Sequence, residues 1–313
     1  MASTQQIKAR IKSVKNTKQI TKAMEMVAAS KMRRAQETTL ASRDYTRMAG
    51  QILTRLRELT DVSKHPLFAQ REQKSRILVV ITSDRGLAGA YNSSVLRQLT
   101  KELKTDKENG TKTSLILIGK QAAKFAARIE GLHILGSYDH MPEKPVVADL
   151  ASVLDTVKTK FVGEVQESSN EEEKDNDEEQ QESKKTLPPE TDAVDVLYTD
   201  YKSSVVQEVT IQRLLPAAFT ESHVSADLGA ALFEPSPKAV LDQVVERLVD
   251  VQLWQAYLES QASEQSSRMM AMKTASDNAG DLIDDLTLAA NSARQAAITQ
   301  ELAEITGGAE AMS

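Results

Sequence analysis

Two stretches at the ends of the chain are long, periodic and nearly free of glycine and proline. The first glycine is Gly50 and the first proline is Pro66. Before them, apolar or small residues recur mostly in steps of three, four or seven: Ile7, Ile11, Val14, Met24, Ala28, Met32, Ala35, Ala49, Leu53, Leu56 and Leu59. This spacing predicts a helix from Thr4 to Leu59. At about 1.5 Å per residue it would be roughly 80 Å long, with Gly50 as the candidate position for a bend.

The C-terminal stretch follows Pro235 and Pro237, which suit a helix start, and it carries a heptad pattern. One row reads Leu241, Leu248, Gln255, Ala262, Met269, Ser276, Ile283, Ala290 and Ala297, and the other reads Val244, Val251, Leu258, Gln265, Met272, Ala279, Leu286 and Ala293. Apolar positions sustained at this spacing predict a coiled coil, which at ~1.5 Å per residue would approach ~100 Å if it continues to Ile305. The polar or small members Gln255, Gln265 and Ser276 lower its stability but can fix its register.

The two ends of the chain differ in charge. Residues 1–60 carry 13 basic and 4 acidic side chains, whereas residues 238–313 carry 5 basic and 12 acidic ones. Two long helices of opposite charge are expected to pair as an antiparallel coiled coil. The alternative is two halves of an ordinary helical bundle, but globular helices are usually much shorter.

The middle of the chain alternates between two kinds of segment. Strands are predicted at 75–84, 112–119, 132–138, 193–201 and 204–216, the last two antiparallel, and helices at 93–104, 120–130 and 147–165. Strands that alternate with helices indicate an α/β lobe with a mostly parallel sheet. An acidic, low-complexity tract at about 166–191 interrupts this lobe, and its composition predicts a disordered surface insert.

Sequence chemistry gives no active site. The chain has no cysteine, and its four histidines show no metal-ligand spacing. The loop "ITSDRGLAGAYNSS" at 81–94 follows a strand and precedes a helix, where phosphate-binding loops lie, but it lacks both glycine-rich phosphate motifs. We interpret it as a tight turn with Asn92 or Ser93 capping the helix. No apolar run approaches the roughly 18 residues that span a bilayer. From these residues we expect no cofactor and no metal, and a small enzyme that uses the central lobe is disfavoured by the missing phosphate motif.

The opening helix is strongly basic. Residues 7–36 contain nine lysines and arginines and one acid, Glu25. Such a stretch can bind nucleic acid, but no aromatic residue accompanies it to stack on bases. We therefore expect its basic face to meet acidic protein surfaces, namely the C-terminal helix of the same chain and loops of partner chains.

Five blocks of sequence together resemble one known family. They are "NTKQITKAMEMVAASKMRRAQ" at 16–36, "SDRGLAGAYN" at 83–92, "FEPSPKAVLD" at 233–242, "ASEQSSRMMAMKTASDNAGDLI" at 262–283 and "ARQAAITQELAEITGGAEA" at 293–311. In this order they are similar to the gamma chain of the rotary F-type ATP synthase. The acidic tract departs from the family pattern, and it lacks the cysteine pair of the chloroplast regulatory insert.

The resemblance implies a fold that matches the reading of the residues. A shaft would form from residues 1–62 and 235–313, and a Rossmann-like lobe from residues 63–234. It implies a central rotor shaft that couples ion-driven rotation of a c-subunit ring to ATP synthesis or hydrolysis in three alpha and three beta chains, with an epsilon chain bound at the lobe end. The absence of a presequence favours the cytoplasmic side of a bacterial inner membrane, reached through the complex. The alternative is a free-standing coiled-coil or nucleic-acid-binding protein. Whether protons or sodium ions drive rotation stays open.

The resemblance also implies residues that contact partners. Those expected to face the beta chains are Lys22, Met24, Lys31, Arg268, Arg294, Gln295, Thr299 and Glu304. Glu234 is expected near the c ring or epsilon chain.

Overall fold

The computed structural model describes residues 4–61, 65–163, 165–166, 185–186, 189–217, 233–234 and 236–310. Most of the acidic tract predicted at 166–191 therefore lies outside the described residues. The described chain divides into two compact units. One contains residues 1–31, 87–89 and 265–313, and the other contains residues 32–86 and 90–264. We call them the terminal unit and the lobe unit.

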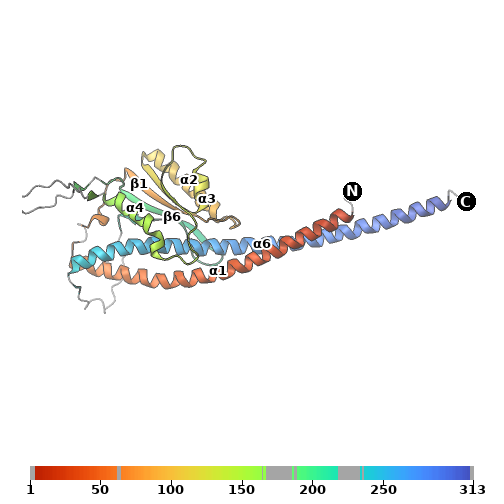
Figure 1. Ribbon diagram of the computed structural model, residues 1–313, viewed down its shortest axis with the longest axis horizontal. Helices are drawn as coiled ribbons and strands as arrows, with labels where there is room; N and C mark the ends of the chain where they lie inside the picture. The colour runs from red at the N-terminus through yellow and green to blue at the C-terminus, as the bar shows by residue number, and fades with distance from the viewer. Residues whose placement is uncertain are drawn as a thin grey trace, which may run out of the picture. The chain divides into compact units, whose positions relative to one another are not determined.

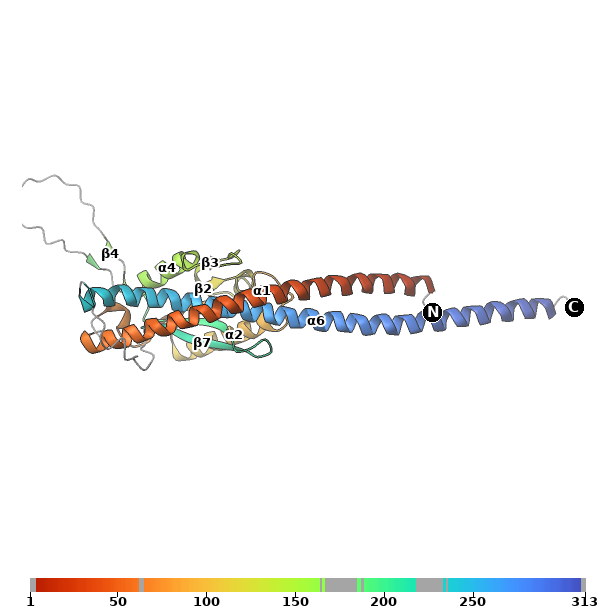
Figure 2. The same ribbon diagram turned by 90° about the horizontal axis from the view of Figure 1, so that it is seen from below.

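Two long helices contribute to both units. Helix α1 covers Thr4–Leu59 and helix α6 covers Pro237–Glu310, with 56 and 74 residues respectively. Helix α1 continues through Gly50 without interruption. In each unit the two helices lie side by side and run in opposite directions (Figures 1 and 2). The predicted pair of antiparallel end helices is confirmed, although Leu59, a member of the predicted apolar row, is 44% exposed.

Several members of the heptad rows of α6 are buried. In the lobe unit Leu241, Leu248, Val251 and Leu258 are buried, and in the terminal unit Met272, Ser276 and Ala279 are buried. The pattern ends near the C-terminus, where Ala297 is exposed.

The lobe unit contains a five-stranded sheet in the order β3-β2-β1-β6-β7. Its strands are β1 (Ser75–Ile81), β2 (Lys112–Ile118), β3 (His133–Tyr138), β6 (Ala193–Tyr201) and β7 (Gln207–Leu215). The first four are parallel, and β7 is antiparallel to β6. The mostly parallel sheet expected from the sequence is confirmed. The two-residue strands β4 (Val165–Gln166) and β5 (Lys185–Thr186) form a separate antiparallel sheet.

Helices cover both faces of the sheet. Successive residues of a strand point to opposite faces, so Leu78 and Val80 of β1 pack with α2 (Tyr91–Asn109) and α3 (Lys120–Ala126). Ile77 and Val79 instead belong to the core formed with α4 (Ala151–Val162), α1 and α6. Two short 3₁₀ helices, η2 (Pro66–Phe68) and η3 (Val147–Leu150), close the connections. The second core fixes the sheet to the long helices within this unit.

The start of α2 corrects a prediction from the sequence. Its N-cap is Ala90, without a side-chain cap. Asn92 Oδ1 instead accepts from the backbone N–H of Ser83 at 3.1 Å, and the Ser93 hydroxyl donates back to the Ala90 carbonyl oxygen at 3.0 Å. Neither residue caps the helix. Asn92 instead ties the first turn of α2 to the segment that follows β1.

Candidate functional site

The basic face of α1 is exposed in the terminal unit. Lys8, Arg10, Lys12, Lys15 and Lys18 are all exposed, although the Lys18 ammonium lies beside Gly280 of α6, and none of the five makes an ion pair with another described residue. The expected contact of the basic face with the acidic C-terminal helix is therefore not made through ion pairs of these five side chains. What packs against α6 in this unit is the apolar row that includes Ala28, which is 1% exposed. The uncompensated positive charges are available to a partner.

The three predicted contact residues on α1 lie in different surroundings. The Lys22 side chain is 58% exposed and pairs with Glu25 at 3.0 Å, one turn further along the helix. Met24 and Lys31 are half-buried. Because exposed ion pairs within one helix contribute little to stability, a partner carboxylate can compete with Glu25 for the Lys22 ammonium at small cost.

Arg268 differs from the other predicted contact residues. It lies on the part of α6 in the terminal unit and is only 9% exposed, and it already has a polar partner within the chain. Its neighbour Met270 is 38% exposed. At this level of α6, therefore, the apolar side chain is the more accessible of the two.

The C-terminal part of α6 is exposed to solvent. Arg294, Gln295, Thr299 and Glu304 are all exposed. The Thr299 hydroxyl donates to the Gln295 backbone carbonyl at 3.0 Å, and Gln300 Nε2 donates to Glu304 Oε1 at 2.9 Å. These bonds lie within the helix, so they leave the surface open to a partner.

An apolar stripe accompanies these polar residues, and the sequence analysis missed it as a candidate. Ile298, Leu302 and Ile305 are 44%, 59% and 69% exposed. Their spacing of four and three places them on one face of the helix. The signal was present in the sequence, because these residues continue a helical apolar pattern outside the two heptad rows. Exposed apolar side chains in a row typically mark a protein interface.

Glu234 lies at the other end of α6, just before the helix begins. It is exposed, whereas the adjacent Phe233 is partly buried against the larger core of the lobe unit. Phe233 therefore fixes the backbone from which the Glu234 carboxylate projects.

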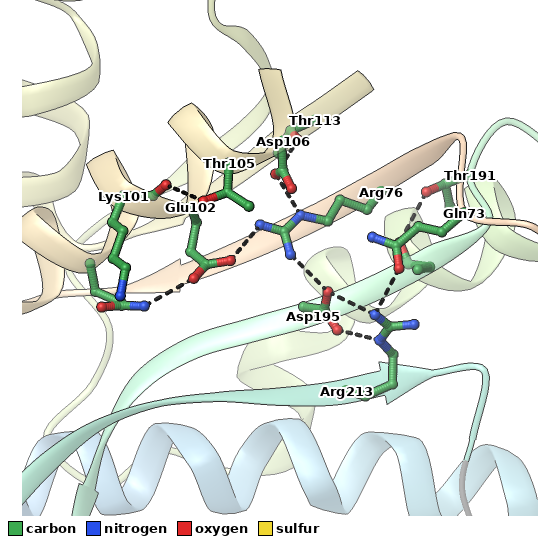
Figure 3. Close-up of polar contacts among 12 residues, drawn as sticks. Gln73, Arg76, Lys101, Glu102, Thr105, Asp106, Thr113, Thr191, Asp195 and Arg213 are labelled. Atoms are coloured by element: carbon green, nitrogen blue, oxygen red, sulfur yellow. Dashed lines mark hydrogen bonds and ion pairs between the residues drawn. The ribbon is translucent and has the colours of Figure 1, made fainter. Parts of the chain in front are cut away.

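The largest buried cluster of charges lies inside the lobe unit (Figure 3). Arg76 on β1 donates from Nε to Asp106 at 2.7 Å, from Nη1 to Asp195 at 3.3 Å and from Nη2 to Glu102 at 3.1 Å. Arg213 on β7 also binds the Asp195 carboxylate. Because all the described donors of Arg76 reach carboxylates of the same unit, this cluster fastens α2 to the sheet and offers no vacant ligand group.

A second fastening lies at the start of β1. Asp192 accepts from the backbone N–H groups of Ser75 and Lys74 at 2.8 and 3.0 Å. Partial burial opposes ionisation of this carboxyl group, but the hydrogen bonds from Ser75 and Lys74 and the charge of Arg71 outweigh it and lower the pKa of Asp192. The Asp192 carboxylate thus fixes the segment that precedes β6 to the start of β1.

The described residues offer little for chemistry on a ligand. They contain no group of three or more metal-ligating side chains that could hold an ion. None of the helices in the described part of the chain is both long and apolar enough to cross a membrane. The site candidates are therefore the exposed surfaces of the long helices.

Comparisons with known proteins agree on one family. Residues 3–312 match the family model described as ATP synthase. The ATP synthase gamma chain of Legionella pneumophila strain Corby is 35% identical, and the match covers all of both chains. A chain in the central stalk and c-ring structure of the Tetrahymena thermophila mitochondrial ATP synthase is 25% identical with a TM-score of 0.57, covering 82% of this chain and 99% of that one. A chain of the Euglena gracilis mitochondrial ATP synthase OSCP/F1/c-ring structure has the same fold, with 17% identity and a TM-score of 0.64 over 99% of this chain and 94% of that one.

Proposed function

The chain belongs to the gamma-chain family of ATP synthases, and we propose that the exposed surfaces of α1 and α6 are the ones through which this rotor shaft meets the other chains of the enzyme. The chain is a non-catalytic subunit, and ATP is made or hydrolysed elsewhere in the complex. Family membership leaves the nucleic-acid alternative without support.

The shaft couples ion-driven rotation to catalysis by differential contact. A rotating element can change the state of a catalytic site only if its interaction free energy differs between the conformations of that site. Helices α1 and α6 meet this need because their exposed faces differ. In the terminal unit α1 presents unpaired cations, whereas the end of α6 presents acids and an apolar stripe. Each orientation of such a shaft gives a surrounding chain a different surface.

The contacts proposed for the beta chains follow from these exposures. Lys22 and Lys31 offer positive charge to acidic loops, with Met24 as the apolar neighbour. Arg294, Gln295, Thr299 and Glu304 offer polar contacts at the end of α6, and Ile298, Leu302 and Ile305 surround them with apolar area. Arg268 would act through a mostly buried guanidinium group. The observation that carries the proposal is the exposure of charged and apolar residues together on helices that pack on one side only.

The remaining assignments concern the other end of the molecule. We propose the division into a shaft of residues 1–62 and 235–313 and a lobe of residues 63–234, with Glu234 facing the c ring or the epsilon chain. Two structural neighbours come from structures that include a c-ring, which supports this placement. The chain would then lie on the cytoplasmic side of a bacterial inner membrane, held there by the complex.

Cross-linking from single positions tests the proposal. The sequence has no cysteine of its own, so one introduced cysteine can carry a photo-activated cross-linker in the assembled enzyme. We expect Lys22→Cys and Thr299→Cys to cross-link to beta chains, and Glu234→Cys to a c or epsilon chain, identified by mass spectrometry of native membranes.

Lys104 provides the matched control. It is a helical lysine on α2 whose side chain is 79% exposed, and no partner contact is proposed for it. Cross-linking of Lys104→Cys to beta chains as efficiently as Lys22→Cys would contradict a specific shaft contact. A Lys22→Cys enzyme that cross-links to no beta chain would exclude this residue from the interface.

A further inference from the structure

A polar layer interrupts the apolar contact between α1 and α6 in the lobe unit. The layer consists of Thr39 and Ser42 on α1 and Gln255 and Glu259 on α6. Thr39, Ser42 and Glu259 are 1%, 4% and 7% exposed. Further along the same pair of helices the buried residues are apolar: Leu53, Leu56, Leu241, Val245 and Leu248. The polar layer thus borders an apolar section of the contact.

The polar layer contains a chain of hydrogen bonds with one direction. The Ser42 hydroxyl, which has one proton to donate, lies within hydrogen-bond distance of the side-chain oxygen of Gln255 and of the Thr39 backbone carbonyl at 2.9 Å. The amide nitrogen of Gln255 donates in turn to Glu259 Oε1 at 2.8 Å. Because the Gln255 amide must accept on one side and donate on the other, its orientation is fixed, and the chain joins α1 to a carboxylate on α6.

The β6–β7 hairpin is fastened at the same level. Gln36 of α1 donates from its side-chain amide to the Tyr201 hydroxyl, and the Ser263 hydroxyl of α6 donates to the Thr199 backbone carbonyl at 3.1 Å. The hydrogen bond and charge of Asp200 raise the pKa of Lys202, and the charges of Glu208 and Glu259 contribute to the same shift. Two helices and a hairpin are therefore linked by polar groups over a few helical turns.

Polar groups in a helix–helix contact have a recognisable effect. They lower stability compared with apolar residues, but they allow only the register in which their hydrogen bonds form. Leucines do not discriminate in this way, since an apolar side chain packs acceptably against several neighbours. The buried Thr39 hydroxyl oxygen makes no hydrogen bond with any described residue, which is consistent with a layer that is not optimised for stability.

We propose that Ser42, Gln255 and Glu259 are positioning residues that lock the register of α1 against α6 under load. This inference rests on the rotor-shaft role stated above. Torque passing along the shaft would otherwise be lost in sliding or twisting of the two helices against each other. The layer thus lowers the stability of the helix pair but permits only one register of α1 against α6.

The test replaces the layer by apolar residues in the full chain. We expect the double variant Gln255→Leu with Glu259→Leu to keep or raise the thermal unfolding midpoint of the chain. In membrane vesicles with the assembled enzyme, ions pumped per ATP hydrolysed should fall about twofold or more, because the register is no longer specified. A residue that acts only through stability would not produce this combination.

Two further variants separate the causes. Glu259→Gln retains an acceptor for the Gln255 amide, so we expect it to keep the pumping ratio, and Leu248→Met changes the apolar part without adding polar groups, so it should also pump normally. A double variant that pumps at the wild-type ratio overturns the proposal, as does one that loses pumping together with a lowered unfolding midpoint. Loss of pumping in Glu259→Gln as large as in the leucine variant would contradict the hydrogen-bond chain as the cause. Pumping by the wild-type enzyme in the same vesicles tests the shaft role separately.

Discussion

The lobe unit and the terminal unit treat charge in opposite ways. In the lobe unit Arg76, Asp106 and Asp195 are 6%, 6% and 2% exposed and pair with one another. In the terminal unit Lys8, Lys12 and their basic neighbours are exposed and make no described ion pair. A buried charge is retained only when it is paired, whereas an exposed unpaired charge is free to attract a partner. One unit therefore uses charge to hold itself together, and the other displays it.

The same contrast holds for apolar residues. Leu56 of α1 is fully buried in the lobe unit, whereas Leu288 of α6 is 77% exposed in the terminal unit. Both lie on long helices, and most of the stability of helices in proteins comes from packing. The lobe unit has buried apolar cores, although Val205 at its surface is 72% exposed, whereas the end of α6 in the terminal unit exposes its apolar residues along a continuous stretch. Substitutions matched between the two units can test this difference.

The largest expected effect is in the buried ion cluster. Arg76→Met removes the cation that faces Asp106, Asp195 and Glu102, so buried carboxylates lose their main partner. We expect the free energy of unfolding of the lobe unit to fall by about 3–5 kcal/mol. Trp254, the only tryptophan, lies in this unit, and its fluorescence during urea unfolding reports the change.

Lys12→Met provides the control in the terminal unit, since this side chain is exposed. It should change the free energy of unfolding by no more than about 0.5 kcal/mol. A loss of similar size for both variants would mean that the terminal unit also depends on its charges for stability.

The second comparison removes the same side chain in both units. Leu56→Ala should destabilise the lobe unit by about 2–5 kcal/mol, because the lost packing leaves a cavity in its core. Leu288→Ala should cost no more than about 0.5 kcal/mol in the isolated chain. Urea unfolding of the two variants, followed by circular dichroism and by Trp254 fluorescence, gives both values. Equal losses would contradict the claim that α6 is uncovered at Leu288.

Local patterns predicted the secondary structure well. The predicted strand at 193–201 matches β6 at both ends, and the predicted helix Thr4–Leu59 matches α1. These elements were predictable because each is a long apolar or periodic run without proline, and the single glycine of α1, Gly50, does not interrupt the helix. The heptad rows of α6 predicted some of its buried residues, such as Leu241 and Leu258, but Val245 and Leu253 are buried outside the rows because this part of α6 also packs against the sheet.

What the sequence could not show depends on contacts between distant residues. Arg76 meets Asp106 across 30 residues and Asp195 across 119, and no local pattern marks such pairs. The capping role expected of Asn92 was wrong for a similar reason, since its amide binds Ser83 at the end of β1. The charge counts of the two chain ends likewise do not reveal which face of α1 turns to α6.

The smallest expected effect concerns pH and the connection between α1 and β1. His65 Nδ1 accepts from the backbone N–H of Leu67 at 3.2 Å and so caps η2. Burial lowers the pKa of His65 from its ordinary value near 6.5, and the carboxylates of Asp242 and Glu246 oppose this shift without cancelling it. Protonation would convert the Nδ1 acceptor into a donor facing another donor, so the folded unit favours the neutral ring.

The sign of the pH effect follows from that preference. Because the folded pKa lies below the unfolded one, the unfolded chain binds the proton first as pH falls. The contribution of His65 to stability is therefore fully present above about pH 6.5 and is lost as pH decreases through the folded pKa. Urea unfolding at pH 7.5 and at lower pH should show this loss by Trp254 fluorescence. His65→Asn places an amide oxygen where Nδ1 accepts but does not titrate, so this variant should match the wild type at pH 7.5 and lose less stability on acidification. If both proteins lose the same free energy of unfolding, His65 is not the group that responds. Carboxyl groups of the lobe unit would then account for the pH dependence.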